Sequence, residues 1–305
     1  MLQETPVGEK GASWFFVISL ALSLLNSAAL ACDEQKVLEV RYPTRTIQSE
    51  LSDYEKYWQG LLRLALEKSG CRFDLSPVDG EGLTHARIIR SIRSDGLVNV
   101  AYMGTSREFE AQMRPIRIPV FRGLIGYRIL MIRAQDQPLF SSISNLSEFT
   151  RYSIGQGIKW SDVQILQDAG FQVIEMPYKS LFRALNAGRF QAISRAAHEI
   201  KPELALVRKE LPGLAVEQSL ILAFRQASFF FVAKDDTPLA EALEGGLNNA
   251  YDDGSFMAFY LSSPVVQQAH QILHEPGRRL FWIENNHLTP ETRDLPGKYW
   301  FAFDN

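Results

Sequence analysis

The sequence YSIGQGIKWSDVQILQDAGFQVIEMPYKSLFRALNAGRFQAISRAA, residues 152–197, decides the fold class of this chain. Short apolar runs alternate in it with longer amphipathic runs, which begin at capping residues and end at Gly170 or Gly188. We expect strands over 151–154, 171–174 and 190–193, and helices that begin at 161–162 and at 180. Strands that alternate with helices of this length predict an α/β fold with a mostly parallel, doubly wound sheet.

The carboxyl ends of these strands are the expected ligand side. Gly155-Gln156-Gly157 is predicted to be a turn that lets the backbone approach a ligand, and Arg195 follows the third strand. Because ligands of doubly wound sheets bind beyond the carboxyl ends of the strands, the turn and Arg195 are expected to lie at one site.

Composition limits the function classes. The 305 residues are 46% hydrophobic and 22% charged, which is ordinary for a globular protein and enough for two modest domains. A net charge of −3 leaves no basic excess for a phosphate backbone, so no nucleic-acid partner is expected. The five His and two Cys show neither C-x-x-C nor H-x-x-x-H spacing, so we expect no metal and no cofactor.

Residues 1–31 are typical of a secretory signal peptide. Lys10 precedes an apolar run over 14–25, and Ala29-Leu30-Ala31 forms an A-x-A cleavage site before Cys32. The alternative is an uncleaved membrane anchor, which the shortness of the run and its interrupting serines disfavour. The mature protein is therefore expected to be soluble in the periplasm, an oxidising compartment.

Cys32 has two interpretations. Ala29 stands where the lipoprotein cleavage motif usually has a larger aliphatic residue, so lipidation at Cys32 is the second choice. Cys71, the only other cysteine, follows the first predicted helix, and in a parallel βαβ unit this point and the start of the first strand share one sheet edge. A disulfide between Cys32 and Cys71 is favoured.

Two lobes are predicted from a repeated pattern. Segments 88–108 and 181–199 share a helix, a glycine stop, a short strand and a basic residue just beyond it, although chance similarity is the alternative. The extended segment 114–123 and the return of the chain near 216–224 predict two hinge crossings. The expected organisation is a signal peptide, a discontinuous first lobe and a second lobe inserted in it: 1–31, then 32–121 plus 223–305, and 122–222.

Three motifs carry a family resemblance. The segment 145–157 is similar to L-x-G-K-x-V-G-V-x-x-G, 185–192 is similar to L-x-x-G-R-x-D-A, and 247–256 is similar to a closing helix followed by D-G-T-Y. Over essentially the whole mature chain, the sequence resembles extracellular family 3 of the periplasmic solute-binding proteins. The resemblance implies a type II periplasmic-binding-protein fold that closes over a small ligand and presents it to an ABC permease.

The sequence departs from this family at two ligand positions. The family's acid that holds an α-ammonium group falls on Arg195 or Ala196, and its S-x-S-x-T-x-x-R motif is matched only by the shorter 102–107, ending at Arg107. Two arginines suit an anion, so we expect a small organic anion, an amino acid or carboxylate, with zwitterionic amino acids binding poorly.

The predicted ligand contacts come from both lobes. Aromatic walls, hydroxyl donors and anion-holding groups are expected from Tyr42, Thr105, Ser106, Arg107, Gly157, Lys159, Trp160 and Arg195. Each has a purely structural alternative: a surface ion pair for the arginines, packing for the aromatic residues, solvation for Lys159 and turn formation for the hydroxyls.

Binding is favoured over catalysis, because the sequence shows no Ser-His-Asp set, G-x-S-x-G or metal arrangement. His198-Glu199 is the only adjacent pair near Arg195 suited to proton chemistry, and it is predicted to begin a helix. The alternative binding role is sensing, in which the ligand-bound protein docks on a membrane signalling receptor. A monomer is expected in either role.

Overall fold

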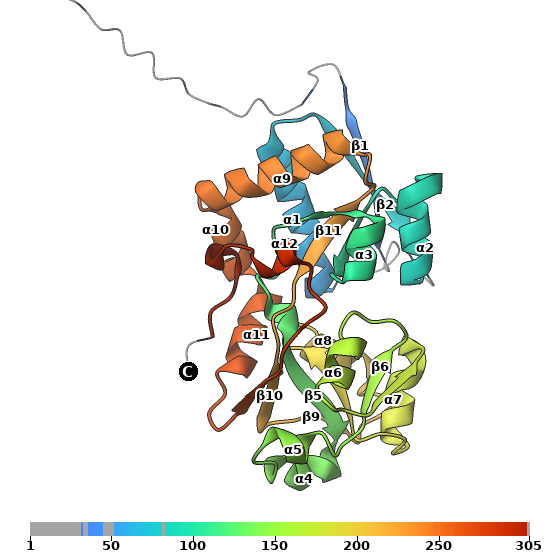
Figure 1. The fold of residues 1–305 in the computed structure, drawn as a ribbon, viewed down its shortest axis with the longest axis vertical. Coiled ribbons are helices and arrows are strands. Elements are labelled where there is room, and N and C mark those ends of the chain that lie inside the picture. Colours follow the sequence, from blue (N-terminus) through green and yellow to red (C-terminus); the bar gives the residue numbers. More distant parts are fainter. Residues whose placement is uncertain (1–31, 33–35, 45–51, 81–82, 304–305) are drawn as a thin grey trace, which may run out of the picture.

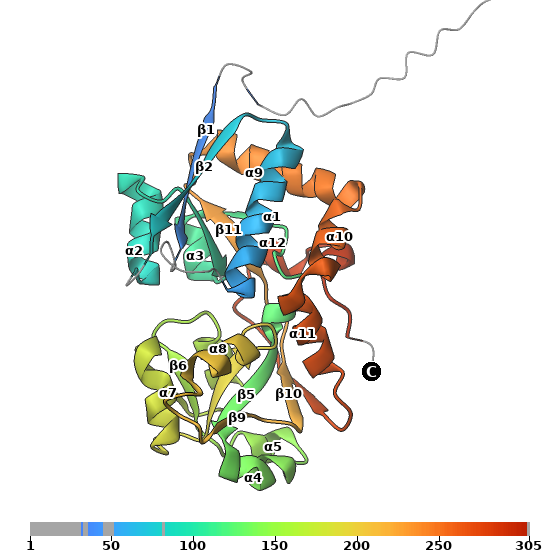
Figure 2. The same cartoon turned by 180° about the vertical axis from the view of Figure 1, so that it is seen from behind.

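The computed structural model describes residues 32, 36–44, 52–80 and 83–303, so the predicted signal peptide lies outside the described residues. Figures 1 and 2 show two lobes stacked along the long axis of the molecule and joined by a narrower waist. No helix in the described ranges is long and apolar enough to cross a membrane.

The first lobe begins with alternating strands and helices and is completed by helices from the end of the chain. Its elements are β1 (Leu38–Thr44), α1 (Asp53–Ser69), β2 (Phe73–Asp79), α2 (His85–Arg90), η1 (Ser91–Asp95), β3 (Val100–Gly104), α3 (Arg107–Gln112), β4 (Arg114–Ile116), β11 (Ser228–Val232), α9 (Thr237–Asp252), α10 (Ser255–Ser262), α11 (Pro264–Leu273), α12 (Pro290–Arg293) and η4 (Gly297–Tyr299). β1 pairs with β2 in parallel, and β11 lies between β3 and β4. The backbone and side chain of Asn99 bridge these two groups by hydrogen bonds to Arg41.

The second lobe is built around a seven-stranded sheet. Its elements are η2 (Leu124–Gly126), β5 (Tyr127–Arg133), η3 (Ala134–Asp136), α4 (Gln137–Ser141), α5 (Leu146–Phe149), β6 (Ile154–Gly157), α6 (Val163–Asp168), β7 (Val173–Met176), α7 (Tyr178–Asn186), β8 (Ala192–Ala196), α8 (Ile200–Val207), β9 (Leu214–Val216) and β10 (Leu220–Ala223). The strand order is β12-β10-β5-β8-β6-β7, with β9 beside β5 and β12 (Arg279–Trp282) at one edge. The predicted α/β architecture of two lobes is confirmed.

Strand direction follows the path of the chain between the lobes. β5 enters the second lobe from the waist and runs antiparallel to β8 and β10, whereas β6 is parallel to both β7 and β8. In the same way β11 enters the first lobe and is antiparallel to β3 and β4. The carboxyl ends of β3, β6 and β8 therefore face the waist.

The C-terminal region adds a connection that the sequence did not indicate. Residues 279–282, assigned above to the first lobe, form β12 and pair in parallel with β10 of the second sheet. The chain then returns to the first lobe, where the hydroxyls of Thr289 and Thr292 donate to Glu110. β12 was misassigned because its pairing depends on a neighbour some 60 residues earlier in the chain, which no local pattern reveals. The lobe boundaries at 121/122 and 222/223 remain a prediction.

Two further expectations have clear outcomes. A disulfide joins Cys32 to Cys71, with 5.3 Å between their Cα atoms, in agreement with the favoured interpretation. Gly155 and Gly157, predicted to form a turn, instead belong to β6, and the turn follows at 157–160. Both glycines are needed for space: an added Cβ would lie 2.3 Å from the Phe190 ring at Gly155 and 2.1 Å from the Trp160 ring at Gly157.

Candidate functional site

A cavity of 670 Å³ lies between the lobes and is lined from both. The first lobe contributes Pro43, Thr44, Ser52, Tyr54, Glu55, Trp58, Gly80, Leu83, His85, Ile88, Tyr102, Met103 and Gly104. The second lobe and the crossing segments contribute Ile125, Arg128, Trp160, Ser161, Asp162, Tyr178, Arg195, Glu199, Pro202, Glu203, Leu206 and Gln226. A volume of this size is typical of small-molecule sites.

The first-lobe wall is aromatic. Tyr54 and Trp58 lie one turn apart on α1 and project from the same face, and Tyr102 comes from β3. The Trp58 and Tyr102 rings stack with centroids 6.0 Å apart and planes 13° apart, and Tyr54 lies 6.1 Å from Tyr102. Tyr42 packs edge-on against Trp58. This wall offers flat apolar surface to a ligand.

The second-lobe wall is built around Arg195 at the end of β8. Its guanidinium lies over the Trp160 ring, 4.2 Å from the centroid. Nε and one terminal nitrogen donate to the two oxygens of Glu203, each at 2.6 Å, and Glu199 is a second acid 3.1 Å away. The Tyr178 hydroxyl also donates to Glu203. The Arg195 side chain is thus held between a ring and two carboxylates.

A second buried ion pair lies deeper in the same wall. Arg128 Nη2 lies 2.7 Å from Asp162 Oδ2, and both side chains are almost fully buried. Arg128 also donates to the Ile125 carbonyl and to the carbonyl and hydroxyl of Ser194, so all three of its nitrogens have partners. Asp162 stands at the N-cap of α6 but makes no side-chain cap, because its carboxylate accepts from Arg128 and Gln156 instead.

The lining carries more acids than bases. Four acids, Glu55, Asp162, Glu199 and Glu203, and two arginines, Arg128 and Arg195, line the cavity, so the lining has two more carboxyl groups than guanidinium groups. Burial raises the pKa of Glu203. Burial acts in the same direction on Glu199, but Arg195, His198, Arg128 and the Ala196 N–H together outweigh it, so the pKa of that acid is lowered. The positive cleft predicted from Arg107 and Arg195 is not what the described residues form.

His198 adjoins this cluster at the waist. It is buried, its ring stacks on Phe121 with centroids 4.1 Å apart, and it faces Tyr54 at 5.8 Å. Neither ring nitrogen has a hydrogen-bond partner among the described residues. Burial lowers the pKa of His198 to about 4, so the ring is neutral at physiological pH.

Gln226 joins the two sides of the cavity. Its Nε2 donates to the Thr105 carbonyl of the first lobe at 2.9 Å and to Ser161 Oγ of the second at 3.1 Å. Asn285, in the returning C-terminal segment, donates to Gln226 Oε1. The lobes are therefore already in contact at this edge of the cavity.

Only two of the predicted contact residues line the cavity, Trp160 and Arg195. Gly157 lies directly beneath Trp160. Lys159 is exposed, and its backbone N–H donates to Glu175 in a turn with φ of 58°. Tyr42 lies in the core behind Trp58.

The three residues predicted after β3 do not line the cavity either. The Thr105 hydroxyl donates to Glu110, and Ser106 caps α3 by accepting from Phe109 N. Arg107 begins α3, and its Nε donates to the Leu288 carbonyl. Helix α3 begins directly after the strand, so these side chains serve the first lobe.

Several lining residues were missed. Tyr54 and Trp58 have helical spacing that indicates core packing, and Asp162 and Glu199 stand where helices begin. The one signal that could have assigned Asp162 and Glu199 to the site is that these acids follow soon after β6 and β8, because ligands bind beyond those strand ends.

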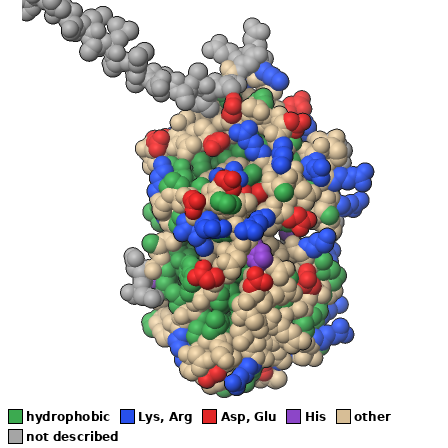
Figure 3. Space-filling view, in the orientation of Figure 1, with side chains coloured by type: hydrophobic (Ala, Val, Ile, Leu, Met, Phe, Trp, Pro, Cys, Tyr) green, Lys and Arg blue, Asp and Glu red, His purple; other side chains and the backbone are tan. Residues whose placement is uncertain are grey.

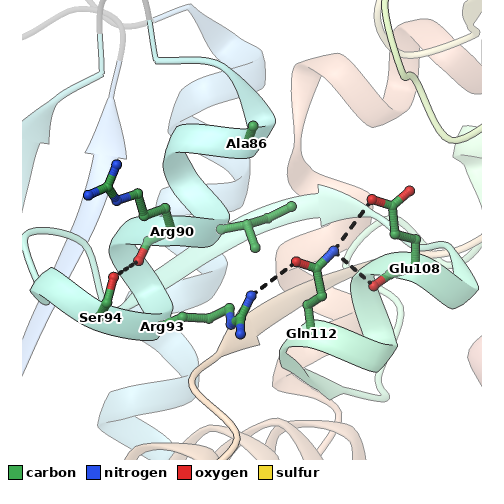
Figure 4. A pocket seen from close by; sticks show the side chains of 7 residues that line it. Ala86, Arg90, Arg93, Ser94, Glu108 and Gln112 are labelled. Carbon is green, nitrogen blue, oxygen red and sulfur yellow. Dashed lines mark hydrogen bonds between the residues drawn. The ribbon is translucent and has the colours of Figure 1, made fainter.

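A smaller pocket of 370 Å³ lies away from the waist, among α2, η1 and α3 (Figure 4). Its polar side chains bind one another: Arg93 donates to Gln112, and Gln112 donates to Glu108. It is lined from the first lobe alone, so the cavity between the lobes is the better candidate. Among the residues described, no group of three or more His, Cys, Asp or Glu side chains could hold a metal ion.

Comparison with protein-family models gives no match, and comparison with curated proteins gives none that is significant. Among solved structures, an ancestral arginine-binding protein bound to arginine covers 76% of this chain and 100% of its own, with a TM-score of 0.50 and 18% identity. A histidine kinase sensor domain similar to periplasmic binding proteins covers 76% and 97%, with a TM-score of 0.52 and 16% identity. A periplasmic binding protein of Salmonella typhimurium with high arginine specificity covers 74% and 99%, with a TM-score of 0.52 and 13% identity. At these identities only the shared fold is established.

Proposed function

We propose that this chain, which has the two-lobed fold of the periplasmic binding proteins, is a solute-binding protein that takes a small organic ligand between its lobes. It acts as a monomer in the periplasm and delivers the ligand to an ABC permease. The observation that carries the proposal is the 670 Å³ cavity, to which both lobes contribute functional side chains.

The two walls of the cavity differ in character: the first-lobe wall is aromatic and the second-lobe wall is charged. The first lobe offers the faces of Tyr54, Trp58 and Tyr102, and the second offers the polar cluster around Arg195. Apolar surface with a few converging polar groups is the usual composition of a ligand site. Closure of the lobes would bring the two walls onto opposite sides of one ligand.

Binding fits this cavity better than catalysis does. Glu199 and Glu203 both bind Arg195, so the three charged side chains are fixed by their own ion pairs. His198 beside them is neutral and buried, with no oriented partner within the part of the chain described. A general base needs a hydrogen-bonded route to the proton that it abstracts.

Sensing is the second candidate. The same fold occurs in the sensor domain of a histidine kinase, so a membrane receptor is an alternative destination for the ligand-bound protein. Genes next to this one separate the two: permease and ATPase genes support delivery, whereas a kinase gene supports sensing. The disulfide supports an oxidising compartment in either case.

The test is a thermal-shift screen of organic acids, amines and amino acids on the mature protein, with hits confirmed by calorimetry. Solution scattering then measures the radius of gyration with and without the confirmed ligand. We expect at least one ligand class to bind and the radius to fall. If no class raises the melting temperature, the proposed function is wrong.

A further inference from the structure

Arg195 lines the second-lobe wall, and two acids contact its guanidinium. Glu203 engages it with both oxygens at 2.6 Å, and Glu199 lies 3.1 Å from the same guanidinium. The two carboxylates of Glu199 and Glu203 and the single guanidinium of Arg195 therefore have a net charge of −1 when all three are ionised. Around the waist, Figure 3 shows acidic and basic side chains next to one another on the face that it presents.

Arg128 is already paired with an acid. Asp162 neutralises its charge at 2.7 Å, and three further N–H groups donate to Ile125 and Ser194. A ligand carboxylate entering the cavity would therefore meet one arginine already neutralised by Asp162 and one held by two acids. Like charges this close repel strongly in a partly buried site.

A cationic ligand would be attracted to the same side chains that repel a carboxylate. The surplus carboxylate of Glu199 and Glu203 attracts it, and the rings of Tyr54, Trp58 and Tyr102 line the first-lobe side of the cavity. Aromatic faces attract ammonium and guanidinium groups through their quadrupole. Burial raises the pKa of Glu203 and the neighbouring Glu199 acts in the same direction, so a cation bound here would favour the charged form of Glu203.

We infer that the ligand of this cavity is an organic cation without a carboxylate group, held by Glu199 and Glu203 against an aromatic wall. The inference rests on the proposed function and narrows its ligand class. It replaces the organic anion predicted from the sequence.

Calorimetry with three probes of one skeleton tests the inference: 2-phenylethylamine, L-phenylalanine and 3-phenylpropionate. They share a phenyl ring and differ in charge, so the ranking of their affinities reports the charge that the cavity accepts. We expect the amine to bind at least tenfold more tightly than either other probe.

Variants then locate the cation. Glu199→Gln and Glu203→Gln keep the shape of the side chains and remove one charge each. We expect each variant to bind 2-phenylethylamine at least tenfold more weakly. Glu210→Gln is the matched control, because Glu210 pairs with Arg183 on the exposed surface. It should leave affinity unchanged. If one of the two cavity variants does not fold, the other still carries the test.

The results separate this inference from the proposed function. The inference of a cationic ligand is wrong if 3-phenylpropionate or L-phenylalanine binds more tightly than the amine. It is also wrong if neither cavity variant weakens binding of the amine. In both cases the proposed function still stands, with a ligand of another class. If none of the three probes binds, the inference of a cationic ligand is also wrong. The wider screen described above then decides whether the protein binds small molecules at all.

Discussion

Gly157 lies so close beneath the indole of Trp160 that a Cβ built on it would be 2.1 Å from Trp160 Cε2. The last residue of β6 thus sets where the ring lies, and the ring in turn supports the Arg195 guanidinium at 4.2 Å. A residue with no side chain therefore controls one wall of the cavity.

The substitution Gly157→Ala should displace Trp160 and cost roughly 1–3 kcal/mol of unfolding free energy, the usual range for overpacking. Ligand affinity should fall with it, because Arg195 loses its support. Urea unfolding and calorimetry measure the two effects. Gly297→Ala is the control, since no atom lies within 4 Å of its added Cβ, and it should change stability by less than about 0.5 kcal/mol. Equal effects of the two substitutions would show that the Trp160 contact is unimportant.

The buried ring of His198 should make the protein sensitive to acid. Burial lowers its pKa to about 4, so the unfolded chain binds this proton more readily and stability falls as the pH drops from about 6.5 towards 4. At pH 4.5 the loss relative to neutral pH should be roughly 2–3 kcal/mol. Urea unfolding of His198→Phe, which keeps a ring beside Phe121, should lack this part of the acid loss.

The exposed His274 provides the control, and His274→Gln should retain the acid loss of the unsubstituted protein. If His198→Phe and the unsubstituted protein lose stability in parallel between pH 7 and pH 4.5, His198 is not the titrating group.

Removal of the disulfide should destabilise the first lobe. Cys32 and Cys71 are separated by 39 residues, and a loop of that length contributes roughly 2–4 kcal/mol by chain-entropy arithmetic. Cys71→Ser should therefore unfold at lower urea, and adding reductant to the unsubstituted protein should reproduce the shift. A diacylglyceryl group on Cys32 in the mass spectrum of the mature protein would contradict the bridge.

The parts of the fold that follow local rules could be predicted from the sequence. Alternating strands and helices in 152–197 predicted the correct fold class, and the positions of Trp160 just past β6 and of Arg195 near the end of β8 put them at the cavity. The disulfide could be predicted because βαβ geometry brings both cysteines to one sheet edge.

The interactions of Arg195 and Arg107 could not be predicted, because folding brings their partners together from other parts of the chain. From the sequence, Arg195 was either a ligand contact or a surface ion-pair partner, whereas in the structure it is buried and pairs with Glu203 of α8. Arg107 was expected at the cleft from a motif that is one residue short, but the early start of α3 directs it to Leu288. The charge of the site therefore could not be predicted from which residue types follow the strands.

The most direct test of the central claim, that the ligand binds between the lobes, is calorimetry of the confirmed ligand with two single variants. Trp160→Ala removes a wall of the cavity between the lobes, and Gln112→Ala alters the smaller pocket of the first lobe. Thermal unfolding first verifies that both variants fold. We predict that Trp160→Ala weakens binding at least about tenfold, as expected for a buried aromatic contact, while Gln112→Ala leaves the affinity unchanged. Loss of binding in Gln112→Ala, with full affinity in Trp160→Ala, would contradict the account.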